Sequence, residues 1–170
     1  MLIIDCGACI GEFFNSYLNP NNEIYAFEPN LINFRYLQSH YPHSYVKLLN
    51  VAVGTENTET RFYQFDNQNR PGNQGCSFYA DKDNVDPEEW DVVEVIKLSE
   101  FIKQFEHIDI LKLDIEGAEF AVVRDLMKEN VVDRIDKVII EWHDNIPSAF
   151  DPTVRDDFKR LYSHKYVEWH

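Results

Sequence analysis

The chain has 170 residues, a length that fits one domain with a full hydrophobic core. Its 30 acidic residues outnumber the 16 Lys and Arg residues, and the net charge of −14 would repel a nucleic-acid backbone or an anionic membrane surface. The 44% share of hydrophobic residues is typical of a folded globular protein. Since the sequence has no long apolar run, no signal peptide at its start and only three cysteines, we expect a cytoplasmic protein without a disulfide scaffold and without nucleic-acid or membrane partners.

The first half of the chain alternates apolar runs with segments of helical periodicity. In chain order we expect a strand at 2–4, a helix with apolar positions from 10 to 18, a strand at 24–27, a helix with Asn30 as its N-cap, a strand at 45–53 and a more exposed strand at 60–65. Residues 66–91 contain Asn, Gly, Pro and acidic residues without a clean period, so we predict a long loop there.

The second half continues this alternation. We expect a strand at 92–98, a short helix capped by Ser99, a strand at 108–113, a turn at 114–117, a helix with apolar positions 120, 123 and 127, a strand at 138–140, a helix capped by Asp151, and a final strand at 165–169. The alternation indicates an α/β fold in a single domain over 1–170, with a mostly parallel sheet and helices on both faces. In such a sheet the ligand lies beyond the carboxyl ends of the strands, where the strand order reverses.

A glycine-containing turn, D-x-G-x-x-x-G, follows the first predicted strand from Asp5 to Gly11. Glycines there allow backbone to approach a ligand closely, the N–H groups at the helix start are free donors, and Asp5 can accept from a hydroxyl or ammonium group. Glu28, 17 residues beyond Gly11, ends the second strand, where a carboxylate can hold both hydroxyls of a ribose. The turn and Glu28 together predict an adenosine site, whereas the turn alone also fits a tight strand–helix junction.

Five segments carry a resemblance to a known family: IIDCGACIGE at 3–12, YAFEPN at 25–30, NVAVG at 50–54, LKLDIEGAE at 111–119 and IEWH at 140–143. In this order they resemble the FkbM family of S-adenosylmethionine-dependent methyltransferases, and LKLDIEGAE is the most specific of them. The resemblance implies a Rossmann-like class I methyltransferase fold with S-adenosyl-L-methionine as cofactor. It further implies methyl transfer, commonly to a hydroxyl of a sugar or secondary metabolite, so the expected partner is a small-molecule or glycan acceptor.

The resemblance also implies which residues contact the cofactor: Asp5, Gly7, Ala8 and Gly11 around its methionine part, Glu28 at its ribose, and Asn50, Val51 and Ala52 at its adenine, with Pro29 and Asp114 as further cofactor-binding residues. Cys6 and Cys9 replace the residues usually found at their positions in the family. The chain starts at its first strand and stops one strand after residue 142, which indicates a minimal domain or a domain truncated at both ends.

Methyl transfer needs donor and acceptor to be aligned and a proton to be removed from the attacking hydroxyl. The candidate residues follow the two strands that end near Leu113 and Ile140, and they are Asp114, Glu116, Glu141 and His143. We assign acceptor orientation and proton removal to Asp114 and His143, because an imidazole has an ordinary pKa of about 6.5. A surface or capping role for His143 is equally compatible with its position.

Two further points concern this cluster of residues: the role of Glu119 and the possibility of a bound metal. Glu119 starts a predicted helix, where a solvent-exposed role or one at the positive end of the helix dipole is favoured over catalysis. The carboxylates and the imidazole are also ligands that a divalent metal accepts. Because the sequence does not fix their geometry, we assign no metal.

Three alternatives remain at the level of sequence. Cys6 and Cys9 form a Cys-x-x-Cys pair between a strand and a helix, as in thioredoxin-like redox proteins, but this reading gives no role to Gly11 or Glu28. A nicotinamide dehydrogenase would share the fold, but the turn lacks the G-x-G-x-x-G pattern. A noncatalytic cofactor-binding module would share the whole turn. The sequence identifies neither the acceptor, for which Phe78, Tyr79 and Trp90 offer aromatic surface, nor the oligomeric state.

Overall fold

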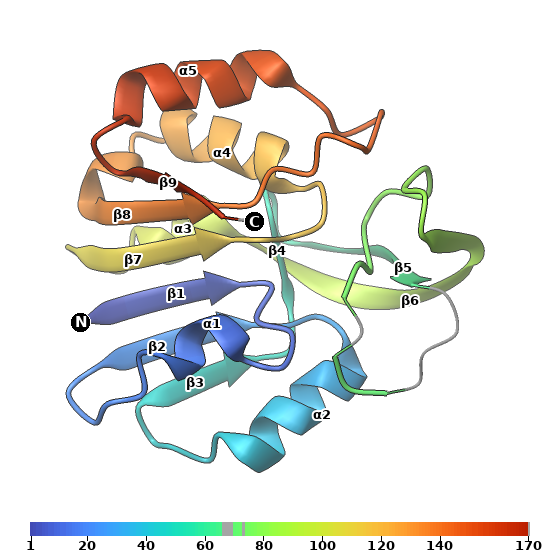
Figure 1. The fold of residues 1–170 in the computed structure, drawn as a ribbon, viewed down its shortest axis with the longest axis horizontal. Coiled ribbons are helices and arrows are strands. Elements are labelled where there is room, and N and C mark those ends of the chain that lie inside the picture. The colour runs from blue at the N-terminus through green and yellow to red at the C-terminus, as the bar shows by residue number, and fades with distance from the viewer. Residues whose placement is uncertain (66–69, 73, 170) are drawn as a thin grey trace.

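A computed structural model describes residues 1–65, 70–72 and 74–169 of the chain. Its centre is a parallel sheet of six strands in the order β3-β2-β1-β7-β8-β9 (Figure 1). The strands are β1 (Leu2–Cys6), β2 (Glu23–Phe27), β3 (Val46–Leu49), β7 (Ile108–Leu113), β8 (Ile135–Ile140) and β9 (Tyr166–Glu168). This arrangement confirms the α/β fold with a parallel sheet, and the strand order has the doubly wound Rossmann pattern.

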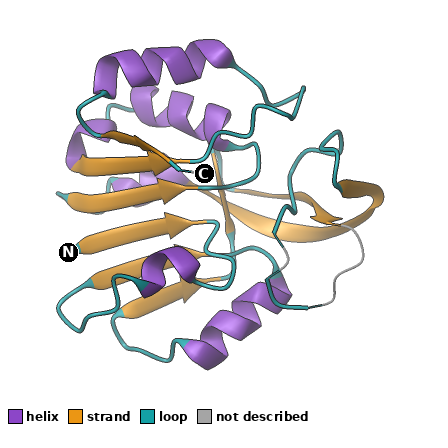
Figure 2. Cartoon of the chain, viewed as in Figure 1, coloured by secondary structure: helices purple, strands orange, loops and turns teal. Residues whose placement is uncertain are grey.

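Helices cover both faces of the sheet (Figure 2). They are α1 (Glu12–Asn15), α2 (Leu31–His40), α3 (Leu98–Ile102), α4 (Glu119–Lys128) and α5 (Pro152–Tyr162), with a 3₁₀ turn at Val132–Arg134. Successive residues of a strand point to opposite faces, so Ile3 packs in a core with α1 and α2, and Ile4 packs in the larger core with α3, α4 and α5. Strands with two apolar faces explain why the sequence shows continuous apolar runs instead of alternation.

A second, smaller sheet extends beyond the carboxyl ends of the central strands (Figure 1). It has the order β4-β6-β5, formed by β4 (Ala52–Gly54), β5 (Thr58–Phe65) and β6 (Val85–Lys97). Two expectations were wrong here. The predicted strand at 45–53 is divided between the two sheets. The second half of the predicted loop at 66–91 is a strand, because residues 85–91 belong to β6 and pair with β5. This antiparallel ribbon is largely exposed to solvent on both faces, so its sequence lacks the alternation of apolar and polar residues that predicts a strand.

Two of the three predicted helix caps are confirmed. Asn30 and Asp151 each accept hydrogen bonds from two N–H groups of the helix that follows, as predicted. Ser99 is not a cap: it lies inside α3, and its Oγ donates to Asp125 Oδ2 of α4 over 2.5 Å. The helix expected over 10–18 is a single turn, since Gly11 before α1 is in the left-handed region.

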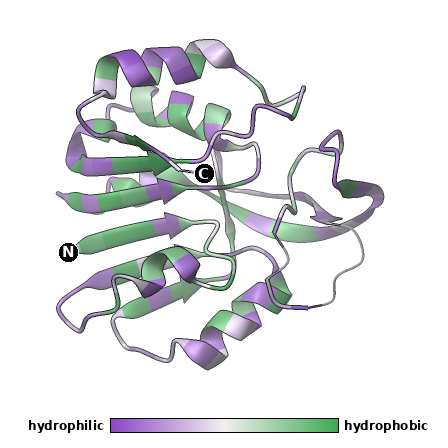
Figure 3. Cartoon of the chain, in the orientation of Figure 1, coloured by the Kyte–Doolittle hydropathy of each residue, from purple (hydrophilic) through white to green (hydrophobic). Residues whose placement is uncertain are grey.

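Hydropathy follows the layers of the fold, with apolar residues concentrated in the central strands (Figure 3). The outward faces of the helices carry polar residues, as expected for helices that cover a sheet. None of the helices in the described part of the chain is long and apolar enough to cross a membrane.

Candidate active site

A cavity of about 330 Å³ lies at the carboxyl edge of the sheet, where the chain order reverses between β1 and β7. This is the place that the fold class predicts for a ligand, and the volume is in the range of small-molecule sites. Nine of the predicted site residues line it: Gly7, Ala8, Glu28, Pro29, Val51, Ala52, Asp114, Glu116 and Glu141. Four others, Asp5, Gly11, Asn50 and His143, are not part of this lining.

The turn after β1 is held by the protein's own acceptors. The N–H groups of Gly7 and Ala8 both donate to the carbonyl of Phe27 over 3.0 Å, and the N–H of Cys9 donates to Glu28 Oε2 over 2.7 Å. These three N–H groups, which precede the start of α1 at Glu12, are therefore engaged within the protein. Gly7 has a φ of +81°, and a Cβ there would lie 1.8 Å from the carbonyl oxygen of Asp114. Its glycine is thus required by the close approach of two neighbouring strand ends.

The carboxylate of Glu28 is buried at the end of β2, with a relative exposure of 5%. Its Oε1 accepts from the N–H of Asn30 over 2.8 Å, and its Oε2 accepts from Cys9. Burial raises the pKa of Glu28 to about 8, although these two N–H donors act in the opposite direction. Each carboxylate oxygen can accept more than one hydrogen bond, so the fixed carboxylate retains acceptor capacity toward the cavity.

Asn50 acts from outside the cavity. Its Nδ2 donates to the backbone carbonyls of Glu28 and Pro29 over 2.9 and 3.0 Å, and this contact fixes the segment that carries Glu28. Val51 and Ala52, the two residues after Asn50, line the cavity wall.

Lys112 is a buried cation at the base of the cavity, on β7. Its Nζ lies 3.4 Å from Asp5 Oδ1 and 3.1 Å from Asp114 Oδ2, and it donates to the Gly7 carbonyl over 2.9 Å. Burial acts to lower the pKa of Lys112, but the charges of Asp5 and Asp114 outweigh it and raise the pKa. Burial raises the pKa of Asp5, and Lys112 offsets part of this effect.

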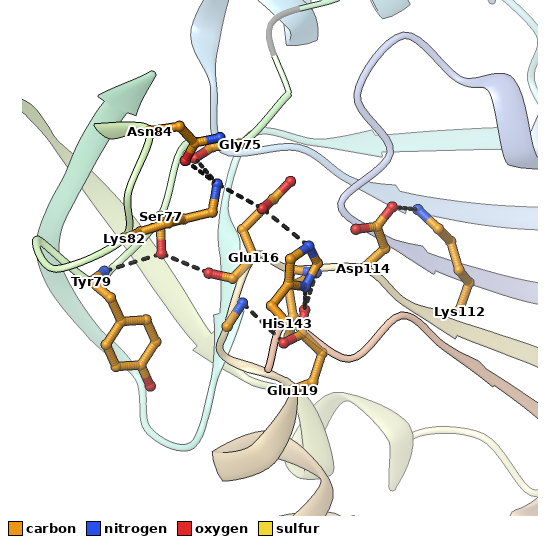
Figure 4. Close-up of polar contacts among 12 residues, drawn as sticks. Gly75, Ser77, Tyr79, Lys82, Asn84, Lys112, Asp114, Glu116, Glu119 and His143 are labelled. Carbon is orange, nitrogen blue, oxygen red and sulfur yellow. Dashed lines mark hydrogen bonds and ion pairs between the residues drawn. The ribbon is translucent and has the colours of Figure 1, made fainter. Parts of the chain in front are cut away.

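His143 lies between two carboxylates (Figure 4). Its Nε2 is 3.1 Å from Glu116 Oε2 and its Nδ1 is 3.0 Å from Glu119 Oε1. Burial acts to lower the pKa of His143, but hydrogen bonds to the two glutamates outweigh it and raise the pKa to about 11. At neutral pH the side chain is therefore an imidazolium whose two N–H groups are both engaged, an arrangement that disfavours proton removal by His143.

Glu119 is fully buried in the first turn of α4, so of the two expected roles the solvent-exposed one was wrong, whereas its place at the start of the helix agrees with the other. Its two oxygens accept from the N–H groups of Ile115 and Gly117 over 2.7 and 2.9 Å, in the same turn that carries Glu116. Burial acts to raise the pKa of Glu116, but His143 and Lys82 hold it below the ordinary value.

Glu141 differs from these paired groups. Its side chain lines the cavity and forms no hydrogen bond or ion pair with the described residues. Burial and the neighbouring charge of Asp114 raise the pKa of Glu141. Asp114, Glu141 and His143 bring one possible metal ligand each within 4.8 Å of one another, but both His143 nitrogens are already paired, and we assign no metal to them.

The profile of the methyltransferase FkbM domain matches residues 5–166. The chain belongs to the FkbM methyltransferase family. It is also similar to the crystal structure of a methyltransferase FkbM from Methylobacillus flagellatus KT, with 17% identity and a TM-score of 0.47. That match covers 75% of this chain and 29% of the other, so the chain spans under a third of that relative's length. The curated proteins contain no match to the chain.

Several cavity residues of this FkbM domain were not predicted, among them Lys112 and the segment 74–76. Lys112 was missed although its signal was present, since a lysine inside a buried apolar strand needs a charged partner. Gln74, Gly75 and Cys76 also line the cavity, and they belong to a segment without a sequence pattern of its own. Phe78 reaches the cavity as well, whereas Trp90 lies on β6 with Arg61 over its ring.

Cys6 at the end of β1 and Cys9 in the turn after it are free thiols in this structure. Cys6 is fully buried, and burial raises its pKa well above the ordinary value. Burial and the charge of Glu28 raise the pKa of Cys9 to about 12. Since a reactive cysteine needs a lowered pKa, these surroundings disfavour the redox alternative.

Proposed function

We propose that the chain is an S-adenosyl-L-methionine-dependent O-methyltransferase that acts on a hydroxyl of a sugar or secondary metabolite. The observation that carries the proposal, beside the family, is the charge of the cavity. Among the described residues its lining includes the acidic side chains of Glu12, Asp114, Glu116 and Glu141, against the ammonium group of Lys112, and Glu28 adds a negative charge once it is ionised. Such a lining suits a ligand with a sulfonium and an ammonium group and opposes the pyrophosphate of a nicotinamide dinucleotide.

The cofactor would lie along the carboxyl edge of β1 and β2. Glu28 has free acceptor capacity for the two ribose hydroxyls, and Val51 and Ala52 offer an apolar wall for the adenine. Gly7 and Ala8 line the part of the cavity next to Asp114, where the methionine portion would sit. Asp5 and Gly11 support this turn from behind, and Asn50 supports Glu28.

When bound, the cofactor supplies a methyl group that its sulfonium sulfur already makes electrophilic. The protein then has to orient the acceptor hydroxyl and take its proton as oxygen bonds to the methyl carbon and the carbon–sulfur bond breaks. We assign the proton to the Glu141 carboxylate, because it lines the cavity without a hydrogen bond or ion pair to the described residues and burial raises its pKa above the ordinary value. Asp114 orients the acceptor, and the His143 imidazolium keeps Glu116 and Glu119 in place.

Calorimetric titration and mass spectrometry test this function. The chain should bind S-adenosylmethionine and S-adenosylhomocysteine but not NADH, and an acceptor from a panel of glycans and hydroxylated metabolites should gain the mass of one methyl group. Binding of NADH alone would overturn the cofactor assignment. Transfer to an amine or thiol in place of a hydroxyl would overturn the acceptor class.

A noncatalytic cofactor-binding module is the second candidate, and it has the same cavity. The two are separated by measuring affinity and transfer independently, since the module would bind the cofactor without methylating any acceptor.

A Cys6→Ser, Cys9→Ser variant addresses redox function: it should retain cofactor binding, whereas loss of a disulfide reductase activity would favour the redox alternative. Free thiols also fit the cytoplasmic location that we propose.

A further inference from the structure

The cavity is covered on one side by a segment that has no regular secondary structure, residues 74–84, called here the cover segment. Its first residues, 74–76, line the cavity. On the side of α2, Asn30 Nδ2 donates to Cys76 Sγ over 3.7 Å. The cover segment therefore starts beside the helix that follows β2, on the Glu28 side of the cavity.

At its other end the cover segment meets the turn that follows β7. The Oγ of Ser77 donates to the backbone carbonyl of Glu116 over 2.6 Å, and the side chain of Lys82 reaches the carboxylate of the same residue (Figure 4). Glu116 has a φ of +56°, which is unusual for a residue with a side chain, and Gly117 has a φ of +107°. Contacts from outside the turn thus hold a backbone conformation that is costly on its own.

Lys82 connects these parts. Its side chain is 3% exposed, and its Nζ donates to the Gly75 carbonyl over 2.7 Å and to Asn84 Oδ1 over 2.6 Å. The same Nζ lies 3.0 Å from Glu116 Oε2, the oxygen that also faces His143 Nε2. A buried ammonium group thus has three oxygen partners, two within the cover segment and one in the turn that follows β7.

Charge explains why this position needs a cation. Lys82, Glu116, His143 and Glu119 alternate in sign, so each carboxylate has a cation beside it. Glu116 faces Lys82 from the cover segment and His143 from the segment after β8, and it repels Glu141. Without Lys82, one buried positive charge is lost, and the Gly75 carbonyl loses its donor at the cavity wall.

We propose that Lys82 is a positioning residue of the cavity: its ammonium group binds the cover segment and the Glu116 carboxylate at once, and thereby holds residues 74–76 against the Glu116–His143 pair. The part of this inference that concerns cofactor binding rests on the proposed function. The part that concerns Glu116 does not, because it depends only on contacts within the chain.

The first test reads the ionisation of Glu116 by NMR, in protein with ¹³C-labelled glutamate carboxyl groups. In Lys82→Met the pKa of Glu116 should rise from its lowered value, and Lys82→Arg should restore it because the charge returns. Asn84→Ala is the matched control: it removes a cover-segment partner of Lys82 without touching Glu116, so the pKa of Glu116 should stay as in the parent. If Lys82→Met does not fold, Lys82→Gln gives the same comparison without the charge.

The second test is calorimetric binding of S-adenosylhomocysteine. Lys82→Met should bind about tenfold more weakly than the parent, which corresponds to about 1.4 kcal/mol, and Lys82→Arg should recover most of the affinity. An unchanged pKa of Glu116 in both uncharged variants overturns the proposal, as does full affinity in a variant that has lost the charge. Failure of the parent to bind S-adenosylhomocysteine overturns the proposed function instead, and the NMR comparison then still decides the role of Lys82.

Discussion

The ammonium group of Lys112 lies 3.4 Å from Oδ1 of Asp5, a carboxylate with no exposed surface. Neither Asp5 oxygen has a hydrogen bond of good geometry among the described residues, so the ion pair with Lys112 is what offsets the burial of this charge. Removing one partner of a buried ion pair typically costs about 3–5 kcal/mol, because the other charge stays buried and uncompensated.

Lys112→Met should therefore lower the free energy of unfolding by about 3–5 kcal/mol in urea denaturation at neutral pH. Adding Asp5→Asn to the same chain removes the uncompensated charge and should recover most of that loss. A double variant as unstable as the single one would show that Lys112 stabilises the turn through the Gly7 carbonyl or Asp114 instead.

Glu28 predicts how cofactor binding depends on pH. Its pKa is raised to about 8 in the empty protein, and ribose hydroxyls that donate to it favour the charged form. Affinity for S-adenosylhomocysteine should therefore increase as the pH rises from 6 to 9, by up to about tenfold per pH unit below the pKa. Titration calorimetry of Glu28→Gln should give weaker binding without this increase; an equal increase in the variant would assign the pH dependence to another group.

His143 predicts a pH dependence of stability with a defined sign. Its pKa is about 6.5 in an unfolded chain and about 11 in the fold, so the folded state holds the proton more tightly. The stabilisation is complete below pH 6.5 and is lost as the pH rises toward 11. Urea denaturation at pH 6 and pH 9 should show a falling stability in the parent and a smaller fall in His143→Asn.

The same His143→Asn variant should be about 3–5 kcal/mol less stable than the parent at pH 6, since Glu119 and Glu116 lose a shared cation. A pH dependence identical to that of the parent would mean that His143 is neutral in the fold, and it would return His143 to the position of a possible base.

The close contact at Gly7, in the turn after β1, can be tested by comparing Gly7→Ala with Gly72→Ala. Both have positive φ, +81° and +85°, but a Cβ at Gly7 would meet the Asp114 carbonyl at 1.8 Å, whereas a Cβ at Gly72 would lie 3.8 Å from the side chain of Ile10. Gly72→Ala should cost about 1 kcal/mol for its backbone conformation alone. Gly7→Ala should cost at least about 2 kcal/mol more, because β1 and β7 must separate. Equal thermal unfolding of the two variants would contradict this contact.

Turnover separates the candidate bases. Glu141→Gln should reduce kcat by about 10²- to 10⁴-fold with little change in cofactor affinity, as expected for loss of a general base. Asp114→Asn should also reduce turnover, but it additionally weakens the pairing with Lys112. Full turnover in Glu141→Gln, together with a large loss in a folded His143→Asn, would return the proton to His143.

The carboxyl ends of the central strands could be predicted because β1, β2, β7 and β8 are continuous apolar runs that end in polar residues. Glu28, Asp114 and Glu141 follow directly from these ends. The division of the predicted third strand could not be foreseen, because its second part pairs with β6, where Ala52 lies opposite Val95 far along the chain.

The sequence alone also could not predict which charged groups pair with one another. Lys82 meets Glu116 across 34 residues of chain, and Lys112 meets Asp5 across 107, so no local pattern relates them. The expected base role of His143 rested on the ordinary imidazole pKa, which holds only while the ring is not flanked by two carboxylates. Glu119 looked like a surface residue because its position on a helix says nothing about the turn that folds over it.

The pairing of β1 with β7 has a consequence for how the chain acquires its structure. Strands β1, β2 and β3 are close in sequence and can assemble early. The other edge of β1 pairs with residues 110–113 of β7, so it stays unpaired until that later part of the chain is available. Until then an apolar strand presents unpaired backbone groups, a form that readily associates with other chains. Contacts of such sequence separation slow folding, so the central strand of the sheet is also the one most exposed to misassembly while the chain is being synthesised.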